Sequence, residues 1–464
     1  MKRNAMRVLA RGEVLVLSSM LVGCTQMTTP AGPRTGSPDA PGEWADAASV
    51  DAASVDVASV DATAISPDAT ATEDASHDVV TAGGIADEAL PLSTCGRWIV
   101  DAQGRRVKLA GVNWYGANDV DLVVGGLDKV SLASVAGKIR ELGFNSVRLP
   151  FSNEMLHSTA VVTDAVAANP TLRGKTAIAI FDATVEALAR AGLLIVLNNH
   201  STHAMWCCNY DDDGLWYTKE YSEEQWIADW EFMAQRYADN PRVVGADLRN
   251  EIRIAKPVTG LLPRLPNWGG GDANDWRAAA TRAGDRIAAK TPRWLIIVEG
   301  LNSADDLTAV GGNPIVLKTP KKLVYSAHQY GFFRPGLPAI PGLGGTYDTM
   351  DAGQLSSASQ KQWGYLTEPA QPFTAPVWLG EFGDSASSDP KWLTNLAAYL
   401  HETDIDWAYW AINGGPKASG DPEPYGLLDD DWTTVRDDWR LSTLRSLQSG
   451  TRGPGITGSA EACP

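Results

Sequence analysis

The sequence predicts an α/β fold, a (β/α)8 TIM barrel that forms a single domain behind a disordered N-terminal linker. Three observations predict it: eight short apolar runs, helical patterns that alternate with them, and polar or aromatic residues where the runs end. Alternation of this kind favours a parallel sheet, and eight units in about 370 residues fit a closed barrel. A doubly wound sheet is the alternative, but no glycine-rich phosphate loop follows the first run.

The first 24 residues have the pattern of an export signal. Four lysine or arginine residues lie among the first eleven, and a mostly apolar run at 14–22 is too short to span a bilayer. The run ends in Leu21-Val22-Gly23-Cys24, which resembles the bacterial lipoprotein box, where the cysteine is lipidated. We expect residues 1–24 to be a lipoprotein signal peptide ending at Cys24. An ordinary signal peptide with a chance cysteine is the alternative.

Residues 25–92 are rich in Ala, Ser, Asp, Thr and Pro and nearly free of aromatic side chains. Such a segment cannot bury enough apolar surface to offset the entropy lost on ordering. We expect a disordered tether that holds the following domain, residues 93–464, away from the membrane. The net charge of −17 argues against nucleic acid and anionic membrane surfaces as partners, so membrane contact is expected only through the lipid anchor.

The repeating pattern of strands and helices fills the rest of the chain. The predicted strands are Val107–Val112, Ser146–Pro150, Leu193–Asn198, Val243–Leu248, Trp294–Val298, Leu323–Ser326, Val377–Leu379 and Asp406–Ala411. The predicted helices are Leu132–Leu142, Ile178–Ala191, Ser222–Tyr237, Ala273–Lys290 and Lys391–Glu402. Ser222 followed by Gln225 is typical of a capping box at a helix start.

Nearly every predicted strand ends in side chains that a core would reject. They are Arg148, His200, Asn250-Glu251, Glu299, His328 with Tyr330, Glu381 and Trp410. In this fold the carboxyl ends of the strands converge on one mouth, where the chemistry lies. A single residue of this kind is usually a satisfied core group, but so many on one rim indicate a functional site.

These residues give the chain a resemblance to glycoside hydrolase family 5, whose clan A barrels carry catalytic glutamates after strands four and seven. The matching motifs are Asn113-Trp114, Arg148 in Val-Arg-Leu-Pro, His200, Asn250-Glu251, His328-Gln329-Tyr330, Glu381 in Leu-Gly-Glu-Phe-Gly, and Trp410. They occur in the expected order over the whole barrel. The resemblance implies that Glu251 is the acid/base and Glu381 the nucleophile.

The residue chemistry supports these roles independently. Hydrolysis of a glycosidic bond with retention needs two carboxyl groups about 5–5.5 Å apart, one protonated and one ionised. Arg148 would keep Glu381 ionised, as a nucleophile requires. The amide of Asn250, beside Glu251, would bind the 2-hydroxyl of the sugar, a contact that strengthens in the transition state.

Further residues are expected to bind or support the substrate. His200 and His328 would bind sugar hydroxyls, Tyr330 would hydrogen-bond the nucleophile, and Trp410 would stack under the reacting sugar. Trp114 is expected to line the mouth together with Tyr115, Trp206, Trp216, Trp268 and Trp432, because these residues fall in the predicted mouth loops and 17 tryptophans exceed the needs of a core. Packing is the alternative role for each. Glu299 is expected to belong to a hydrogen-bond network.

No cofactor and no metal ion is expected. His200 and His203 fall in a loop and lack the Glu of a metalloprotease motif. Export makes disulfides plausible among the remaining cysteines. Cys95 and Cys463 flank the folded region, and Cys207 is adjacent to Cys208, so these two pairs are candidates. The sequence leaves the pairing open, with a zinc site as the weaker alternative.

The predicted activity is that of a retaining endo-β-glycanase, a monomer that hydrolyses β-1,4-linked glucan as a cellulase does. A β-1,4-mannanase, another β-glucanase or a glycolipid glycosidase of the same family are close alternatives, because sugar contacts lie in variable loops. A non-catalytic glycan-binding lipoprotein is the alternative of another class. The expected partner is a polysaccharide or oligosaccharide, met at the cell envelope (outer membrane or surface) or after secretion.

Overall fold

The computed structural model describes residues 85–464 apart from 259, 338–344, 455 and 457–464. Its main element is a closed barrel of eight parallel strands in the order β3, β4, β7, β8, β9, β10, β11 and β12, with β12 pairing back onto β3. The predicted fold class is therefore confirmed. The predicted signal peptide, with Cys24, and residues 25–84 of the predicted linker lie outside the described residues.

Each barrel strand matches one predicted apolar run. The strands are β3 (Ala110–Asn113), β4 (Ser146–Ser152), β7 (Leu194–Ser201), β8 (Val243–Asp247), β9 (Leu295–Glu299), β10 (Leu323–His328), β11 (Val377–Glu381) and β12 (Asp406–Tyr409). In β7 the even-numbered side chains share one face because successive strand residues point to opposite sides. This row changes from Leu194 and Val196, in an apolar cluster, to Asn198 and His200, which hydrogen-bond each other. One strand thus supplies both core and site.

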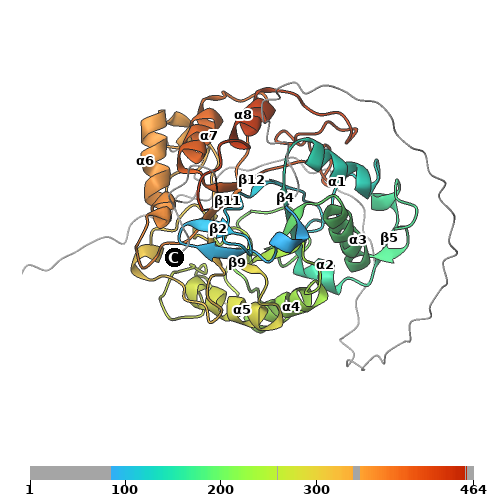
Figure 1. Cartoon of the computed structure of the whole chain (residues 1–464). Helices are drawn as coiled ribbons and strands as arrows, with labels where there is room; N and C mark the ends of the chain where they lie inside the picture. The colour runs from blue at the N-terminus through green and yellow to red at the C-terminus, as the bar shows by residue number, and fades with distance from the viewer. Residues whose placement is uncertain (1–84, 259, 338–344, 455, 457–464) are drawn as a thin grey trace, which may run out of the picture. The chain divides into compact units, whose positions relative to one another are not determined.

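Helices surround the barrel (Figure 1). The five predicted ones are α1 (Leu132–Glu141), α3 (Ala177–Arg190), α4 (Glu223–Arg236), α5 (Trp276–Lys290) and α7 (Lys391–Thr403). The capping box of Ser222 and Gln225 at the start of α4 is confirmed. Three helices were not predicted: α2 (Asn153–His157), α6 (Ala352–Gln362) and α8 (Trp439–Leu447). In α6 the polar sequence buries Leu355, Ser359 and Gln362, so its apolar periodicity is weak.

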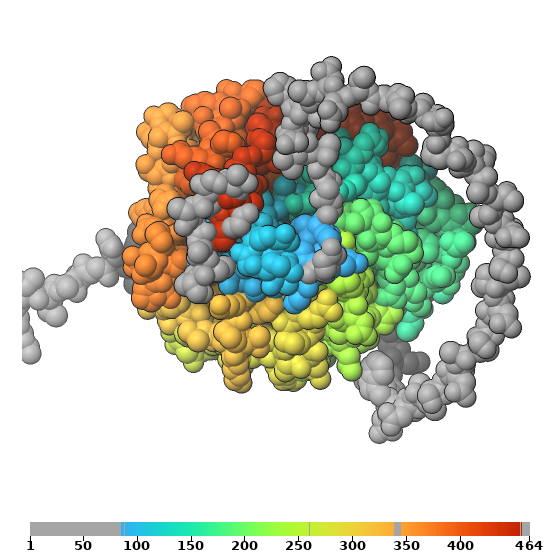
Figure 2. Space-filling view, in the orientation of Figure 1, coloured from blue at the N-terminus to red at the C-terminus, as the bar shows by residue number. Residues whose placement is uncertain are grey.

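The N-terminal residues of the described chain cover the amino ends of the barrel strands. β1 (Ser93–Cys95) and β2 (Trp98–Val100) form an antiparallel hairpin, and Figure 2 shows these blue residues across the centre of this face. Leu90 and Leu92 are buried against the apolar side chains of the strands. The predicted linker end at residue 92 is therefore wrong, because residues 85–92 include apolar side chains that this end of the barrel buries.

The remaining elements are short. They are β5 (Val161–Val162) with β6 (Lys175–Thr176), and the 3-10 turns η1 (Asp87–Ala89), η2 (Asp164–Val166), η3 (Val310–Gly312), η4 (Tyr347–Thr349) and η5 (Gly364–Thr367). Cys207 and Cys208 are joined by a disulfide bond. Cys463 lies outside the described residues, so its pairing with Cys95 stays a prediction. Among the helices described, none is long and apolar enough to cross a membrane.

Candidate active site

A cavity of about 380 Å³ opens where the barrel strands end. Six of the residues predicted from the strand ends line it: His200, Asn250, Glu251, Tyr330, Glu381 and Trp410. Arg148 and His328 lie beneath them, fully buried, and hydrogen-bond to the carboxyl groups. Residues of six barrel strands, or of the segments that follow them, therefore meet at one place, as the sequence predicts; Arg148 comes from within β4 because this strand continues to Ser152.

Two carboxyl groups face each other across this cavity. One oxygen of Glu251, which follows β8, and one oxygen of Glu381, which ends β11, lie within 4.8 Å of each other. The two residues are only 8% and 4% exposed. Retaining glycosidases hold their carboxyl groups about 5–5.5 Å apart, whereas inverting ones need about 6.5–9.5 Å to admit a water molecule. The spacing suits double displacement.

Arg148 organises the floor of the site. Its Nε donates to Asp247 at 2.7 Å, and its Nη2 donates to Asn250 at 2.7 Å and to Glu299 at 3.0 Å. Its Nη1 donates to Glu381. Burial and the neighbouring Asp247 raise the pKa of Glu299 well above its usual range. One buried guanidinium therefore contacts three buried carboxyl groups, those of Asp247, Glu299 and Glu381.

Glu381 accepts hydrogen bonds on both carboxylate oxygens. Arg148 donates to Oε1, and the hydroxyl of Tyr330 donates to Oε2 at 2.9 Å. Burial raises the pKa of Glu381, while the charges of His328 and Arg148 oppose this rise. Burial also lowers the pKa of His328 to about 4, so His328 is neutral near pH 7 and Arg148 supplies the opposing charge. These contacts favour an ionised Glu381.

Glu251 has a different environment. Burial raises its pKa to about 7, against the opposing charges of Arg253 and Arg148. Its backbone has φ 47°, a left-handed conformation that costs a side-chain-bearing residue about 1 kcal/mol or more. The backbone N–H donates to Glu299 at 2.7 Å, which helps to hold this conformation. A carboxyl group that keeps its proton up to neutral pH is suited to act as an acid.

Aromatic rings form one wall of the cavity. Trp410 stacks on Tyr115 with ring centroids 4.9 Å apart and an interplanar angle of 3°. His200 stacks on Trp410 with ring centroids 5.6 Å apart, and Trp206 meets Trp410 edge-on with ring centroids 6.3 Å apart. The apolar faces and edges of such rings suit contact with a pyranose ring.

Two of the predicted mouth residues are not at the mouth. Trp114 is fully buried and donates its indole N–H to the carbonyl of Gly125. Trp216 is fully buried beside Trp226 and Trp276. The prediction that Trp114 and Trp216 contact sugar is therefore wrong, because a position in a loop between elements does not decide which side the ring packs on.

The other aromatic residues predicted at the mouth lie in different places. Trp206 lines the cavity with the carboxyl groups, whereas Tyr115 and Trp432 line a second cavity of about 360 Å³. Lys417 lines both cavities. Trp268 lines neither of them; it donates its indole N–H to the carbonyl of Asn313.

Sequence reasoning missed several groups of the site. Glu423 accepts a hydrogen bond from the hydroxyl of Tyr115, and the Lys417 ammonium lies 4.0 Å from a ring centroid of Trp206. Both lie after β12, in a segment without local periodicity, so no signal marked them. Asp247, by contrast, is the last residue of β8, so the strand-end pattern that predicted Asn250 and Glu251 could also have predicted it.

Groups of metal-binding type also meet here. Glu251, His328 and Glu381 each offer one ligand atom within 4.8 Å of the others, and Cys207, Cys208 and Glu251 do the same. A cation held between the two glutamates would occupy the space that the glycosidic bond needs. The two sulfur atoms are joined to each other and are not free thiolates.

Comparison with known proteins gives concordant results. The model of the family "Cellulase (glycosyl hydrolase family 5)" matches residues 100–416. An endoglucanase of Paenibacillus polymyxa is 34% identical over 359 residues, which cover 74% of this chain and 83% of that protein. The major extracellular endoglucanase of Xanthomonas campestris pv. campestris is 32% identical over 375 residues, 77% of this chain and 71% of that protein.

Solved structures agree with these matches. The catalytic domain of the Xanthomonas campestris enzyme superposes with a TM-score of 0.64 at 29% identity, covering 77% of this chain and 99% of that one. An endocellulase of Pyrococcus horikoshii, solved as a complex with cellotetraose, superposes with a TM-score of 0.65 at 28% identity, covering 78% of this chain and 99% of that one.

Proposed function

Because the chain belongs to the cellulase family, glycosyl hydrolase family 5, we propose that it is a retaining endo-β-1,4-glucanase that uses Glu251 as acid/base and Glu381 as nucleophile. One observation carries the two roles: the paired carboxyl groups lie within 4.8 Å of each other, and of the two it is Glu381 that accepts hydrogen bonds from Arg148 and Tyr330. The names of the relatives, two of them endoglucanases, support the substrate and the mode of cleavage.

In the first step an oxygen of Glu381 attacks the anomeric carbon while Glu251 gives its proton to the glycosidic oxygen. The carbon–oxygen bond to the leaving chain breaks, and a glycosyl ester of Glu381 forms. The pair of hydrogen bonds from Arg148 and Tyr330 orients the attacking carboxylate. The buried guanidinium also keeps Glu381 ionised before attack.

In the second step Glu251 takes a proton from a water molecule, whose oxygen attacks the anomeric carbon and releases Glu381. The ester of Glu381 carries no charge, so the repulsion that opposes ionisation of Glu251 is absent at this stage. Two inversions at the same carbon give net retention. At the end of this step Glu251 is protonated and Glu381 is ionised again, so the enzyme is ready for another cycle.

A panel of polysaccharides tests the substrate. We expect reducing sugar from carboxymethylcellulose and barley β-glucan, with a rapid fall in viscosity because internal bonds are cut. Mannan and glycolipid are expected to be poor substrates. Preferential cleavage of mannan or glycolipid would contradict the glucanase assignment, and binding without turnover on all four would favour a non-catalytic glycan-binding protein.

We also propose an extracellular location with a lipid anchor at Cys24 and a tether between the anchor and the barrel. The basic start, the short apolar run and Leu21-Val22-Gly23-Cys24 support the anchor. The relative from Xanthomonas campestris is named as extracellular. In cells that express the full sequence and are given labelled palmitate, the mature protein should carry the label, whereas the variant Cys24→Ser should stay unlabelled. Equal labelling of both proteins would contradict the anchor. We further propose that the protein acts as a monomer.

A further inference from the structure

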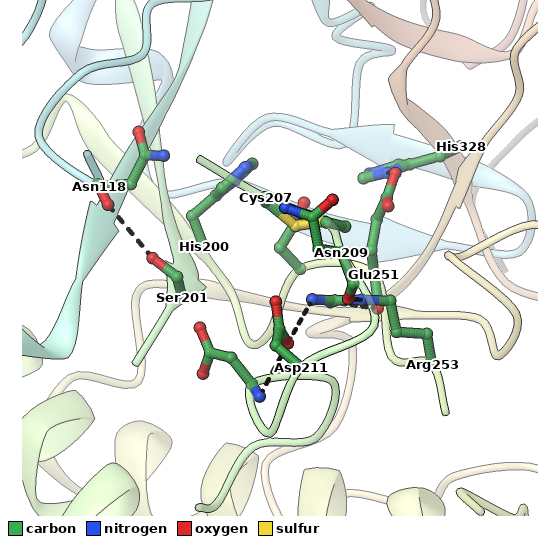
Figure 3. The surroundings of a disulfide bond; sticks show 12 residues. Asn118, His200, Ser201, Cys207, Asn209, Asp211, Glu251, Arg253 and His328 are labelled. Carbon is green, nitrogen blue, oxygen red and sulfur yellow. Dashed lines mark hydrogen bonds and ion pairs between the residues drawn. A yellow bond between two sulfur atoms is a disulfide. The ribbon is translucent and has the colours of Figure 1, made fainter. Parts of the chain in front are cut away.

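The disulfide bond between Cys207 and Cys208 forms part of the wall of the catalytic cavity. Both cysteines line the cavity together with Asn250 and Glu251. Their sulfur atoms and one oxygen of Glu251 lie within 4.8 Å of one another. Figure 3 shows Cys207 between His200 and Glu251. The disulfide therefore lies beside the carboxyl group that is proposed to act as the acid.

The loop that carries the disulfide is fastened to the residues around Glu251. Arg253 donates from Nε to the carbonyl of Asn209 at 3.1 Å and from Nη2 to Asp211 at 3.2 Å (Figure 3). Arg249 donates to Asp213 at 2.7 Å. Because Arg249 and Arg253 flank Glu251, the loop and the end of β8 are held together on both sides of the proposed acid. The place of the disulfide is fixed by these bonds.

The side-chain amide of Asn250 has only one orientation that satisfies its neighbours. Its Oδ1 accepts from Nη2 of Arg148 at 2.7 Å. A guanidinium group can only donate, so the oxygen must face Arg148 and the NH2 group must face the other way. There Nδ2 lies 3.5 Å from Sγ of Cys207 and 3.6 Å from Sγ of Cys208. The disulfide thus accepts the hydrogens that face the cavity.

We propose that the Cys207–Cys208 disulfide is a positioning group, which aims the amide of Asn250 at the 2-hydroxyl of the reacting sugar. Sulfur is a weak acceptor, so it orients the NH2 group without competing with a hydroxyl oxygen in the transition state. A stronger acceptor at this place would hold the amide against the wall. Two thiols would rotate separately and aim it less well. This inference rests on the proposed glycosidase function.

The first measurement uses the variant Cys207→Ala/Cys208→Ala and two aryl β-cellobiosides, one of which lacks the 2-hydroxyl on the sugar next to the aryl group. The preference for the parent substrate is the ratio of the two kcat/KM values. Intrinsic reactivity cancels when this ratio is compared between enzymes. We expect the ratio to fall about tenfold in the variant, the size of one hydrogen bond, mainly through kcat.

The second measurement leaves the sequence unchanged. A phosphine cleaves the disulfide to two thiols and is oxidised to its oxide, with one water molecule supplying the oxygen and both protons. Reduction of the wild-type enzyme should lower the same ratio, and reoxidation should restore it. The double alanine variant is the matched control. Phosphine should leave the substrate ratio of this variant unchanged. This control separates the effect of reducing the Cys207–Cys208 disulfide from the effect of reducing other cysteines.

The outcomes are distinct. A fall of the ratio in the variant and in the reduced enzyme supports the positioning role. A ratio that is unchanged in either enzyme overturns it, because an equal loss of kcat/KM on both substrates reports a structural role alone. Peptide mass spectrometry establishes that Cys207 and Cys208 were reduced. Failure of the oxidised wild-type enzyme to cleave the parent cellobioside would instead overturn the proposed function itself.

Discussion

Replacing Glu381 by alanine is expected to lower kcat on cellooligosaccharides by about 10⁵-fold or more, because no other described group can form the glycosyl intermediate. The substitution leaves a space beside Arg148, whose buried guanidinium then lacks one of its partners. A small anion such as azide fits this space and is attracted by that charge. Azide should therefore attack the anomeric carbon from the face that Glu381 used, and the product should be the α-glycosyl azide. Product analysis by NMR measures the configuration.

The matched control for this variant is Glu299→Gln. Glu299 is as deeply buried and also binds Arg148, at 3.0 Å, but it faces the network beneath the site rather than the cavity. We expect some loss of activity and no glycosyl azide. An azide product of β configuration from Glu381→Ala, or rescue of Glu299→Gln instead, would contradict the nucleophile assignment.

Replacing Glu251 by alanine is expected to have a large effect that depends on the leaving group. Without the proton donor, kcat/KM on cellooligosaccharides should fall by about 10³-fold, within the usual range for general acid catalysis. A dinitrophenyl β-cellobioside needs no proton to leave, so its kcat/KM should fall by less than about tenfold. Hydrolysis of the glycosyl intermediate should slow in this variant, because no base activates the water molecule. Azide should restore turnover and give the β-glycosyl azide as product. Equal losses on both substrates would contradict the role.

The pH dependence follows from the same carboxyl group. Glu251 must be protonated to act as an acid, and burial raises its pKa to about 7. The wild-type kcat/KM on cellooligosaccharides should therefore fall tenfold per unit as pH rises above about 7. This limb should be absent for Glu251→Ala acting on the dinitrophenyl substrate. A limb that persists in the variant would belong to another group.

Most of the barrel could be predicted because its signals are local. The apolar runs of β7 and β11 and the amphipathic pattern of α3 each depend on a few consecutive residues. The elements that were missed have weak local signals. α6 is polar, and α2 has only five residues. The hairpin of β1 and β2 is stable because the barrel's amino end provides the surface that buries it.

The site was predictable to the extent that strand ends define it. Asn250, Glu251 and Glu381 were found because polar residues ending apolar strands must meet at the mouth of a barrel. Trp114 and Trp216 were placed wrongly because an indole ring suits a core as well as a sugar platform. Glu423 and Lys417 lie in an irregular segment and could not be predicted.

The sequence by itself determined the order of strands and helices and the two glutamates proposed for catalysis, because side-chain periodicity and strand ends are properties of neighbouring residues. Only the tertiary structure decided that the carboxyl groups lie within 4.8 Å, that Arg148 binds Glu381, and that a disulfide faces the amide of Asn250. These depend on barrel closure and loop packing, which join residues far apart in the chain.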